Sequence, residues 1–132
     1  MGQQQLLLIV LGVIVVGIAV VVGINLFNAN AVSSNRDGVV SDLNNLGAMA
    51  QQFYKKPTSM GGGGNTFTGG GGWAIAAELD STANGIYINP LPTVAPQSVL
   101  ITGTGTENGP NGSKIVHTAT VSPTAITVTK VN

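Results

Sequence analysis

The sequence predicts an α+β fold, in which one long N-terminal helix packs on a small, mostly antiparallel C-terminal β-sheet. Three observations lead to this prediction. Every residue from 6 to 24 is apolar or glycine, apolar residues recur every three or four positions from 39 to 54, and apolar and polar residues alternate from 114 to 131. The first two patterns are typical of helices and the third of strands. We therefore expect a helical region at 1–56 and a β-rich globular region at 57–132.

The apolar segment 6–24 is long enough to form a membrane-spanning helix. Its length is close to the ~20 residues that cross a bilayer and exceeds the ~7–15 of a signal-peptide core. Its many Val and Ile residues favour strands in water, but in an apolar medium a lone segment must satisfy its own backbone hydrogen bonds, which selects the helix. Gly12, Gly17 and Gly23 lack the spacing of a GxxxG motif. They are either small residues tolerated in a membrane span or positions of close packing in a helix bundle.

We expect the helix to continue into an amphipathic rear half whose apolar face meets the sheet. The Asn and Ser residues between 25 and 35 are weak helix formers, so a kink or short break is expected there. Pro57 ends the helix. A helix continuous from 3 to 54 would be roughly 75–80 Å long at 1.5 Å per residue. The predicted helix–sheet core consists of Val39, Leu43, Leu46, Ala50, Phe53 and Trp73.

The C-terminal region is predicted to begin with a loop and to continue as strands. Two runs of four glycines within 61–72 predict a flexible surface connection; an alternative is that this loop orders only against another copy of the chain. Residues 73–79 are expected to form about two helical turns, at ~3.6 residues per turn. Strand patterns follow at 85–88, 99–103, 114–121 and 125–131, with a turn-rich loop at 106–113. Because so small a sheet buries little by itself, it should pack on the amphipathic helix.

The composition excludes several classes of function. The formal net charge is zero and the basic residues do not cluster, so we expect no nucleic-acid partner. The absence of cysteine excludes disulfides, thiolate zinc sites and cysteine nucleophiles. The single histidine, His117, has no acidic neighbour in the sequence, and no two carboxylates have a catalytic spacing. We therefore expect no enzyme activity, no catalytic residue, no metal, no cofactor and no small-molecule substrate. Asn111 opens an Asn-Gly-Ser triplet and is a candidate for N-glycosylation.

This layout resembles that of bacterial type IV pilins and pseudopilins, and the Met-Gly-Gln-Gln-Gln-Leu-Leu-Leu opening is similar to that of pilin-like proteins. The resemblance implies that the apolar helix is a membrane anchor before assembly and the core of a filament afterwards. The family has a glutamate at the fifth mature position. With Met1 as the first residue the fifth is Gln5, and with cleavage after Gly2 it is Leu7. We expect the first frame, in which Gln3, Gln4 and Gln5 replace the glutamate's charge pairing with amide hydrogen bonds to neighbouring subunits.

The resemblance implies a structural subunit of an extracellular helical filament on the cell surface. Such a subunit polymerises with itself, passes through the inner membrane as a single-pass precursor and uses the pilus assembly machinery. The alternative is a membrane-anchored minor pseudopilin or an exported binding module. A filamentous-phage coat protein fits less well, because the basic cluster that faces the DNA is missing. Adhesion, motility and surface structure remain open as roles. The predicted subunit interface consists of Gln3, Gln4, Gln5, Leu6, Leu7, Leu8, Val10, Leu11, Val13, Ile14, Val16, Ile18, Val20, Val21, Ile24 and Phe27.

Overall fold

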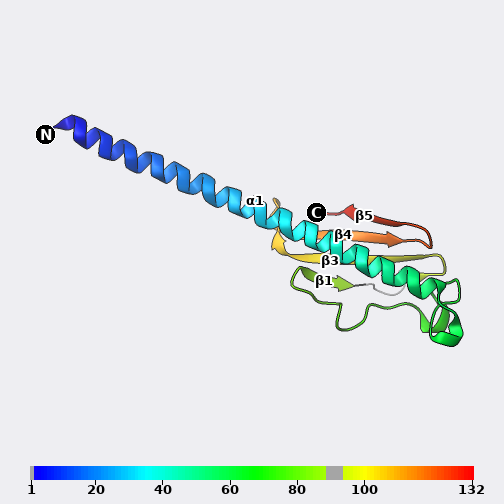
Figure 1. Ribbon diagram of the computed structural model, residues 1–132. Helices are drawn as coiled ribbons and strands as arrows, with labels where there is room; N and C mark the ends of the chain where they lie inside the picture. The colour runs from blue at the N-terminus through cyan, green and yellow to red at the C-terminus, as the bar shows by residue number, and fades with distance from the viewer. Residues whose placement is uncertain (1, 89–93) are drawn as a thin grey trace.

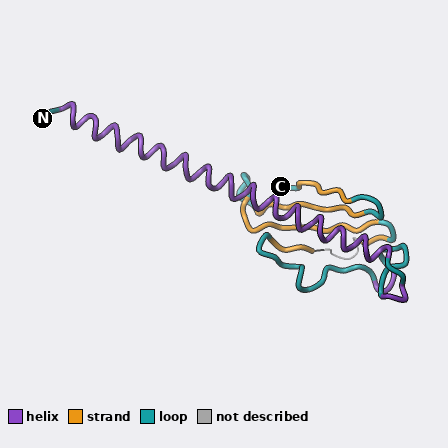
Figure 2. The backbone as a smooth tube through the Cα atoms, in the orientation of Figure 1, coloured by secondary structure: helices purple, strands orange, loops and turns teal. Residues whose placement is uncertain are grey.

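The predicted α+β arrangement is confirmed by the structure, a computed structural model that describes residues 2–88 and 94–132. One helix projects far beyond a small sheet, and only its C-terminal half packs on that sheet (Figures 1 and 2). The elements are α1 (Gln3–Lys55), the short 3-10 turns η1 (Thr58–Met60) and η2 (Gly69–Gly71), and the strands β1 (Gly85–Ile88), β2 (Val94–Ala95), β3 (Ser98–Asn108), β4 (Lys114–Val121) and β5 (Ile126–Lys130).

Helix α1 runs without interruption through residues 25–35, so the break expected there is absent. The buried side chain of Asn35 shows one physical reason. Its Nδ2 donates to the carbonyl oxygen of Asn84 at 2.7 Å, and its Oδ1 accepts from the backbone N–H of Glu107 at 3.2 Å. Asparagine weakens a helix mainly by hydrogen-bonding to its own backbone, and here both ends of the amide are bonded to the globular region instead.

The sheet is antiparallel throughout, in the order β1–β3–β4–β5, with β2 pairing to the start of β3. Strands β1 and β4 have the predicted bounds, and β5 is one residue shorter at each end. The loop predicted at 106–113 is wrong for residues 106–108, because β3 continues to Asn108, which pairs with Lys114 beyond an irregularity in the register. Strand β2 was not predicted, because two residues cannot show an alternating pattern.

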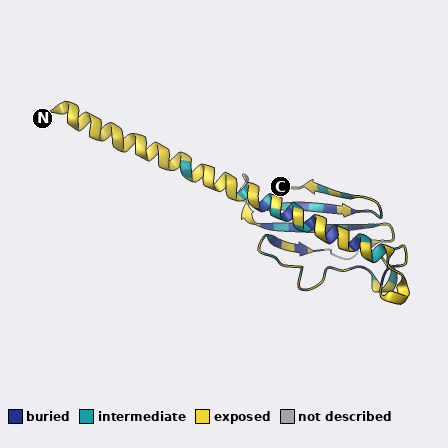
Figure 3. Cartoon of the chain, in the orientation of Figure 1, coloured by how far each residue is buried: buried dark blue, intermediate teal, exposed yellow. Residues whose placement is uncertain are grey.

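The core lies between the sheet and the rear half of α1 (Figure 3). Val39, Leu43, Leu46 and Ala50 are buried on the helix, while Phe53 is half-buried and packs against their cluster. Trp73 joins them from the segment after the glycine-rich loop. The sheet contributes alternate residues, which are Tyr87, Val99, Ile101, Ile115, Ala119 and Val121.

Glycines set how closely the helix approaches the sheet. A Cβ added to Gly47 of α1 would lie 2.9 Å from Cδ1 of Ile126, and one added to Gly103 of β3 would lie 3.1 Å from Cγ1 of Val39 on the helix. At Gly105 the added atom would overlap Oδ1 of Asn35 on the helix. Since real Cβ atoms avoid such distances, a larger side chain at any of these positions would push the two layers apart.

The helical turns predicted for residues 73–79 are not present. Residues 72–76 have no regular secondary structure, and residues 77–79 form a turn. The backbone N–H of Trp73 donates to the carbonyl oxygen of Phe67 at 2.8 Å, so Trp73 is fixed by the loop that precedes it. The prediction that Trp73 points inward holds, because the indole is buried.

The glycine-rich loop, residues 61–72, is a compact structure and not the flexible connection that we predicted. Gly62, Gly63 and Phe67 are buried. The backbone N–H groups of Gly63 and Gly64 donate to the carbonyl oxygens of Phe53 (2.8 Å) and Lys56 (2.9 Å). These carbonyls at the end of α1 lack the N–H partner four residues further on that a continuing helix would supply, so the loop caps the helix.

Glycine is required in this loop for two reasons. Gly61, Gly64, Gly70, Gly71 and Gly72 have positive φ angles, which side chains on Cβ disfavour. Gly62, Gly63 and Gly69 instead lie so close to other backbone atoms that an added Cβ would overlap them.

Candidate functional site: an apolar stem and an adjoining cleft

The front half of α1 is an apolar helix that no other described part of the chain covers. We call residues Leu6–Phe27 the apolar stem and residues 35–132 the base. The large apolar side chains of the stem are between 51% and 76% exposed (Figure 3). Every residue of the predicted subunit interface is exposed in the isolated chain, from Gln3 to Phe27.

The apolar residues surround the stem on all sides and do not form a stripe. Leu6, Leu7, Leu8 and Ile9 already point in four directions, since successive residues are rotated by about 100°. A helix that is apolar all round must be surrounded by apolar material, which is a protein core or a bilayer. The stem has the length and composition needed to cross a membrane. The apolar surface of the stem can therefore be buried either in lipid or against other apolar helices.

The three glycines of the stem have no packing role among the residues that the structure describes. A Cβ added to Gly12, Gly17 or Gly23 would meet no atom within 4 Å. This is the opposite of Gly47, where the sheet leaves no space for a side chain. Both interpretations of the stem glycines, toleration in a membrane and close packing in a bundle, therefore concern contacts outside this chain.

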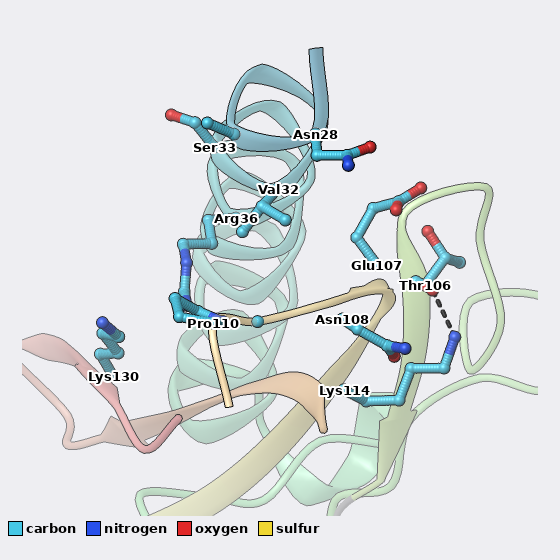
Figure 4. Close-up of a pocket in the computed structure, with 12 residues that line it drawn as sticks. Asn28, Val32, Ser33, Arg36, Thr106, Glu107, Asn108, Pro110, Lys114 and Lys130 are labelled. Atoms are coloured by element: carbon cyan, nitrogen blue, oxygen red, sulfur yellow. Dashed lines mark hydrogen bonds between the residues drawn. The ribbon is translucent and has the colours of Figure 1, made fainter. Parts of the chain in front are cut away.

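A cleft lies where the stem meets the base (Figure 4). Its volume is about 730 Å³, and it separates residues 28–36 of α1, just beyond the stem, from the end of β3 and the loop that joins β3 to β4. The charged groups in its lining are Arg36, Glu107, Lys114 and Lys130, so cations outnumber carboxylates three to one. Sequence analysis missed this group of residues, because they come from separate elements and show no common motif. We call this feature the basic cleft.

Two of the cations in the basic cleft are held in place by backbone oxygens. Nη1 of Arg36 donates to the backbone oxygen of Asn132 at 2.7 Å, and Nζ of Lys114 donates to the carbonyl oxygen of Thr106 (Figure 4). Lys130 is exposed on β5. Because a guanidinium has five donors and an ammonium three, both side chains retain donors for a further acceptor.

Asp42 fastens the segment before β1 to the helix. Its Oδ2 accepts hydrogen bonds from Oη of Tyr87 (2.6 Å), Oγ1 of Thr82 (2.8 Å) and Nδ2 of Asn84 (3.1 Å). Burial raises the pKa of Asp42, but these three donors together lower it below its ordinary value. Burial and the bond to Asp42 raise the pKa of Tyr87. Sequence analysis did not single out Asp42, because its partners are distant in the chain, with Asn84 42 positions away.

His117 is buried between the sheet and the helix, and its Nδ1 has no hydrogen-bond partner among the described residues. Burial, and then the positive charges of Arg36 and Lys130, lower the pKa of His117. A neutral imidazole packed in a core fits a structural role for His117. No group of three or more His, Asp or Glu residues that could hold a metal occurs in the part of the chain that the structure describes.

Asn111, the candidate for glycosylation, is exposed in the turn between β3 and β4. Its Oδ1 accepts from the backbone N–H of Ser113 at 3.0 Å, and its Nδ2 donates to Oδ1 of Asn132. A glycan on Nδ2 would have to displace Asn132.

No protein-family model, no curated protein and no solved structure matches this chain.

Proposed function

We propose that this chain is a structural subunit of an extracellular, pilus-like helical filament, assembled by bundling the apolar stems of many copies. The observation that carries the proposal is the contrast between the two halves of α1. The rear half is buried against a sheet that it fits closely, whereas the front half is apolar on every side and exposed. A helix with these two halves has one packing surface satisfied within the chain and one that only other molecules can satisfy.

The energy available from burying the stem is large enough to drive assembly. Because each of its large apolar side chains is more than half exposed in the isolated chain, burying one would contribute on the order of 1–2 kcal/mol. Seventeen such side chains lie between Leu6 and Phe27, which gives a gross gain of roughly 17–34 kcal/mol. The cost of immobilising one subunit is about 4–15 kcal/mol. Bundling of stems is therefore favourable in water once the bilayer has been left.

The same stem supports a single-pass anchor in the inner membrane before assembly. Its backbone is fully helical, so a bilayer would meet no unsatisfied backbone group along Leu6–Phe27. This observation also favours the second candidate function, a membrane-anchored minor pseudopilin or an exported binding module that never leaves the bilayer. In either case the pilus assembly machinery is the expected partner for export.

Microscopy combined with fractionation separates the two functions. Cells that produce the chain are sheared, and the released material is examined by negative stain and probed with an antibody against the base. The filament proposal expects long, uniform fibres that the antibody decorates along their length. Recovery of the chain in the membrane fraction alone, with no decorated fibre, would refute that proposal and favour the anchored one.

A further inference from the structure

Among the charged residues of the base, two exposed carboxylates lie at one edge of the sheet, and three basic residues line the basic cleft. The acidic edge carries Glu78 and Asp80, which are both exposed. Asp80 lies along the outer side of β1, because its carbonyl oxygen accepts from the backbone N–H of Tyr87 at 2.7 Å and Ser81 forms a bridge with Ile86. Since β1 is one end of the sheet order, these carboxylates stand at one lateral boundary of the base.

The basic residues lie around the cleft at the stem-side end of the sheet, which extends to the opposite edge. Lys130 is the last residue of β5, the strand at the other end of the sheet order. Arg36 leaves α1 on this same side, since it is bonded to Asn132, which follows β5. Lys114 of β4 forms another wall of the basic cleft (Figure 4). Glu78 and Asp80 thus lie apart from the basic cleft, whose lining contains three cations and the single carboxylate of Glu107.

The acidic edge includes a surface turn that is small enough to fit in a cleft. Residues 77–79 form a turn at the surface, closed by a hydrogen bond from the N–H of Leu79 to the carbonyl oxygen of Ala76 at 2.8 Å. The turn therefore presents Glu78 and Asp80 together at the surface. The basic cleft, at about 730 Å³, has room for a turn of this size.

We propose that the acidic turn 77–80 of one subunit docks in the basic cleft of the next, with Asp80 and Glu78 facing Lys130, Arg36 and Lys114. This inference rests on the proposed function, since it names the second contact that holds the filament together. Charge complementarity is the argument that the occupant is a second copy of the chain. Because the two surfaces are different, the contact is heterologous, and such a contact repeats without closing when the rotation does not form a ring. Opposite charges that meet across the contact would fix the register of subunits whose stems carry no charged side chain to specify one.

The test exchanges charges across the predicted contact. The whole 132-residue chain is purified in detergent, and fibres are sedimented after detergent removal at a series of subunit concentrations. Asp80→Lys alone and Lys130→Glu alone should each raise the concentration needed for assembly about tenfold, whereas the double variant should return it to the wild-type value. Raising NaCl should weaken wild-type assembly, because these charges are exposed and screened. Trp73 fluorescence checks that each base is folded, since Trp73 is the only tryptophan and is buried.

A matched control and three outcomes make the test decisive. Lys56→Glu makes the same charge change as Lys130→Glu at the far end of α1, where Lys56 is exposed, and should leave assembly unchanged. If the wild type forms fibres but the single reversals have no effect, or the double variant fails to recover, the docking proposal is wrong and the filament proposal stands. If the wild type forms no fibres, the filament proposal itself fails. If Asp80→Lys has no effect while Lys130→Glu weakens binding to phosphatidylglycerol vesicles, the cleft recognises a membrane surface and the docking proposal is wrong.

Discussion

A lysine in the middle of the apolar stem should prevent assembly without disturbing the base. Val16 lies midway between Leu6 and Phe27, about 15 Å from either end at 1.5 Å per residue, so a lysine there is too far from the ends of the stem to extend its ammonium into water. Val16 is 62% exposed in the isolated chain, and exposed substitutions usually change stability by less than about 0.5 kcal/mol. In a bundle of stems the same change loses the burial of valine, about 1 kcal/mol or more, and places a charge in an apolar medium at about 3 kcal/mol.

Together these terms make the Val16→Lys subunit contact weaker by about 4 kcal/mol, or roughly a thousandfold in the subunit concentration needed for assembly. Sedimentation of fibres after detergent removal measures that concentration, and thermal melting followed by Trp73 fluorescence measures the stability of the base. Leu43→Ala is the comparison variant for the other half of the helix. Leu43 is fully buried in the base, so its truncation should lower the stability of the base by about 2–5 kcal/mol. If Val16→Lys assembled like the wild type, or lowered the melting temperature as much as Leu43→Ala, the division of α1 into two packing surfaces would be wrong.

Three further predictions concern the base, with thermal melting as the measurement. Asp42→Asn should destabilise it by about 1–3 kcal/mol, because a neutral amide is a weaker acceptor for the three donors; an unchanged melting temperature would contradict the anchoring role. The lowered pKa of His117 means that the unfolded chain binds the proton more readily, so stability should be greatest above pH 6.5, fall as the pH drops from 6.5 toward the lowered pKa, and then level off. His117→Leu should remove this dependence, and a pH profile that it leaves unaltered would assign the effect to other groups. Gly63→Ala should open the compact loop at a cost of about 1–3 kcal/mol, because the new Cβ would overlap the carbonyl oxygen of Thr66, whereas Gly12→Ala should leave the base unchanged.

The elements that were predicted from sequence are those whose signals are local. The rear half of α1 shows its apolar face in the spacing from Val39 to Ala50, and β4 shows its buried side in the alternation from Lys114 to Val121. The continuity of α1 through 25–35 could not be predicted in this way. It is supported by Asn35, whose partners Asn84 and Glu107 are 49 and 72 positions away. The hydrogen bonds that Asp42 accepts and the basic cleft could not be predicted from the sequence either, since each brings together residues from separate elements.

The glycines show most clearly what a sequence pattern leaves undetermined. Two glycine runs predicted flexibility, because in isolation such runs leave the backbone unconstrained. In the structure the same residues form a fixed cap on α1, since Gly61 needs its positive φ and Gly63 lies against the backbone of the loop itself. Glycine is therefore present there because nothing else fits. Gly12 and Gly23 of the stem are surrounded by open space and have helical neighbours on both sides, and a glycine inside an exposed helix costs about 1 kcal/mol relative to alanine. No contact among the described residues offsets this cost, and under the filament proposal a neighbouring stem would lie against these positions.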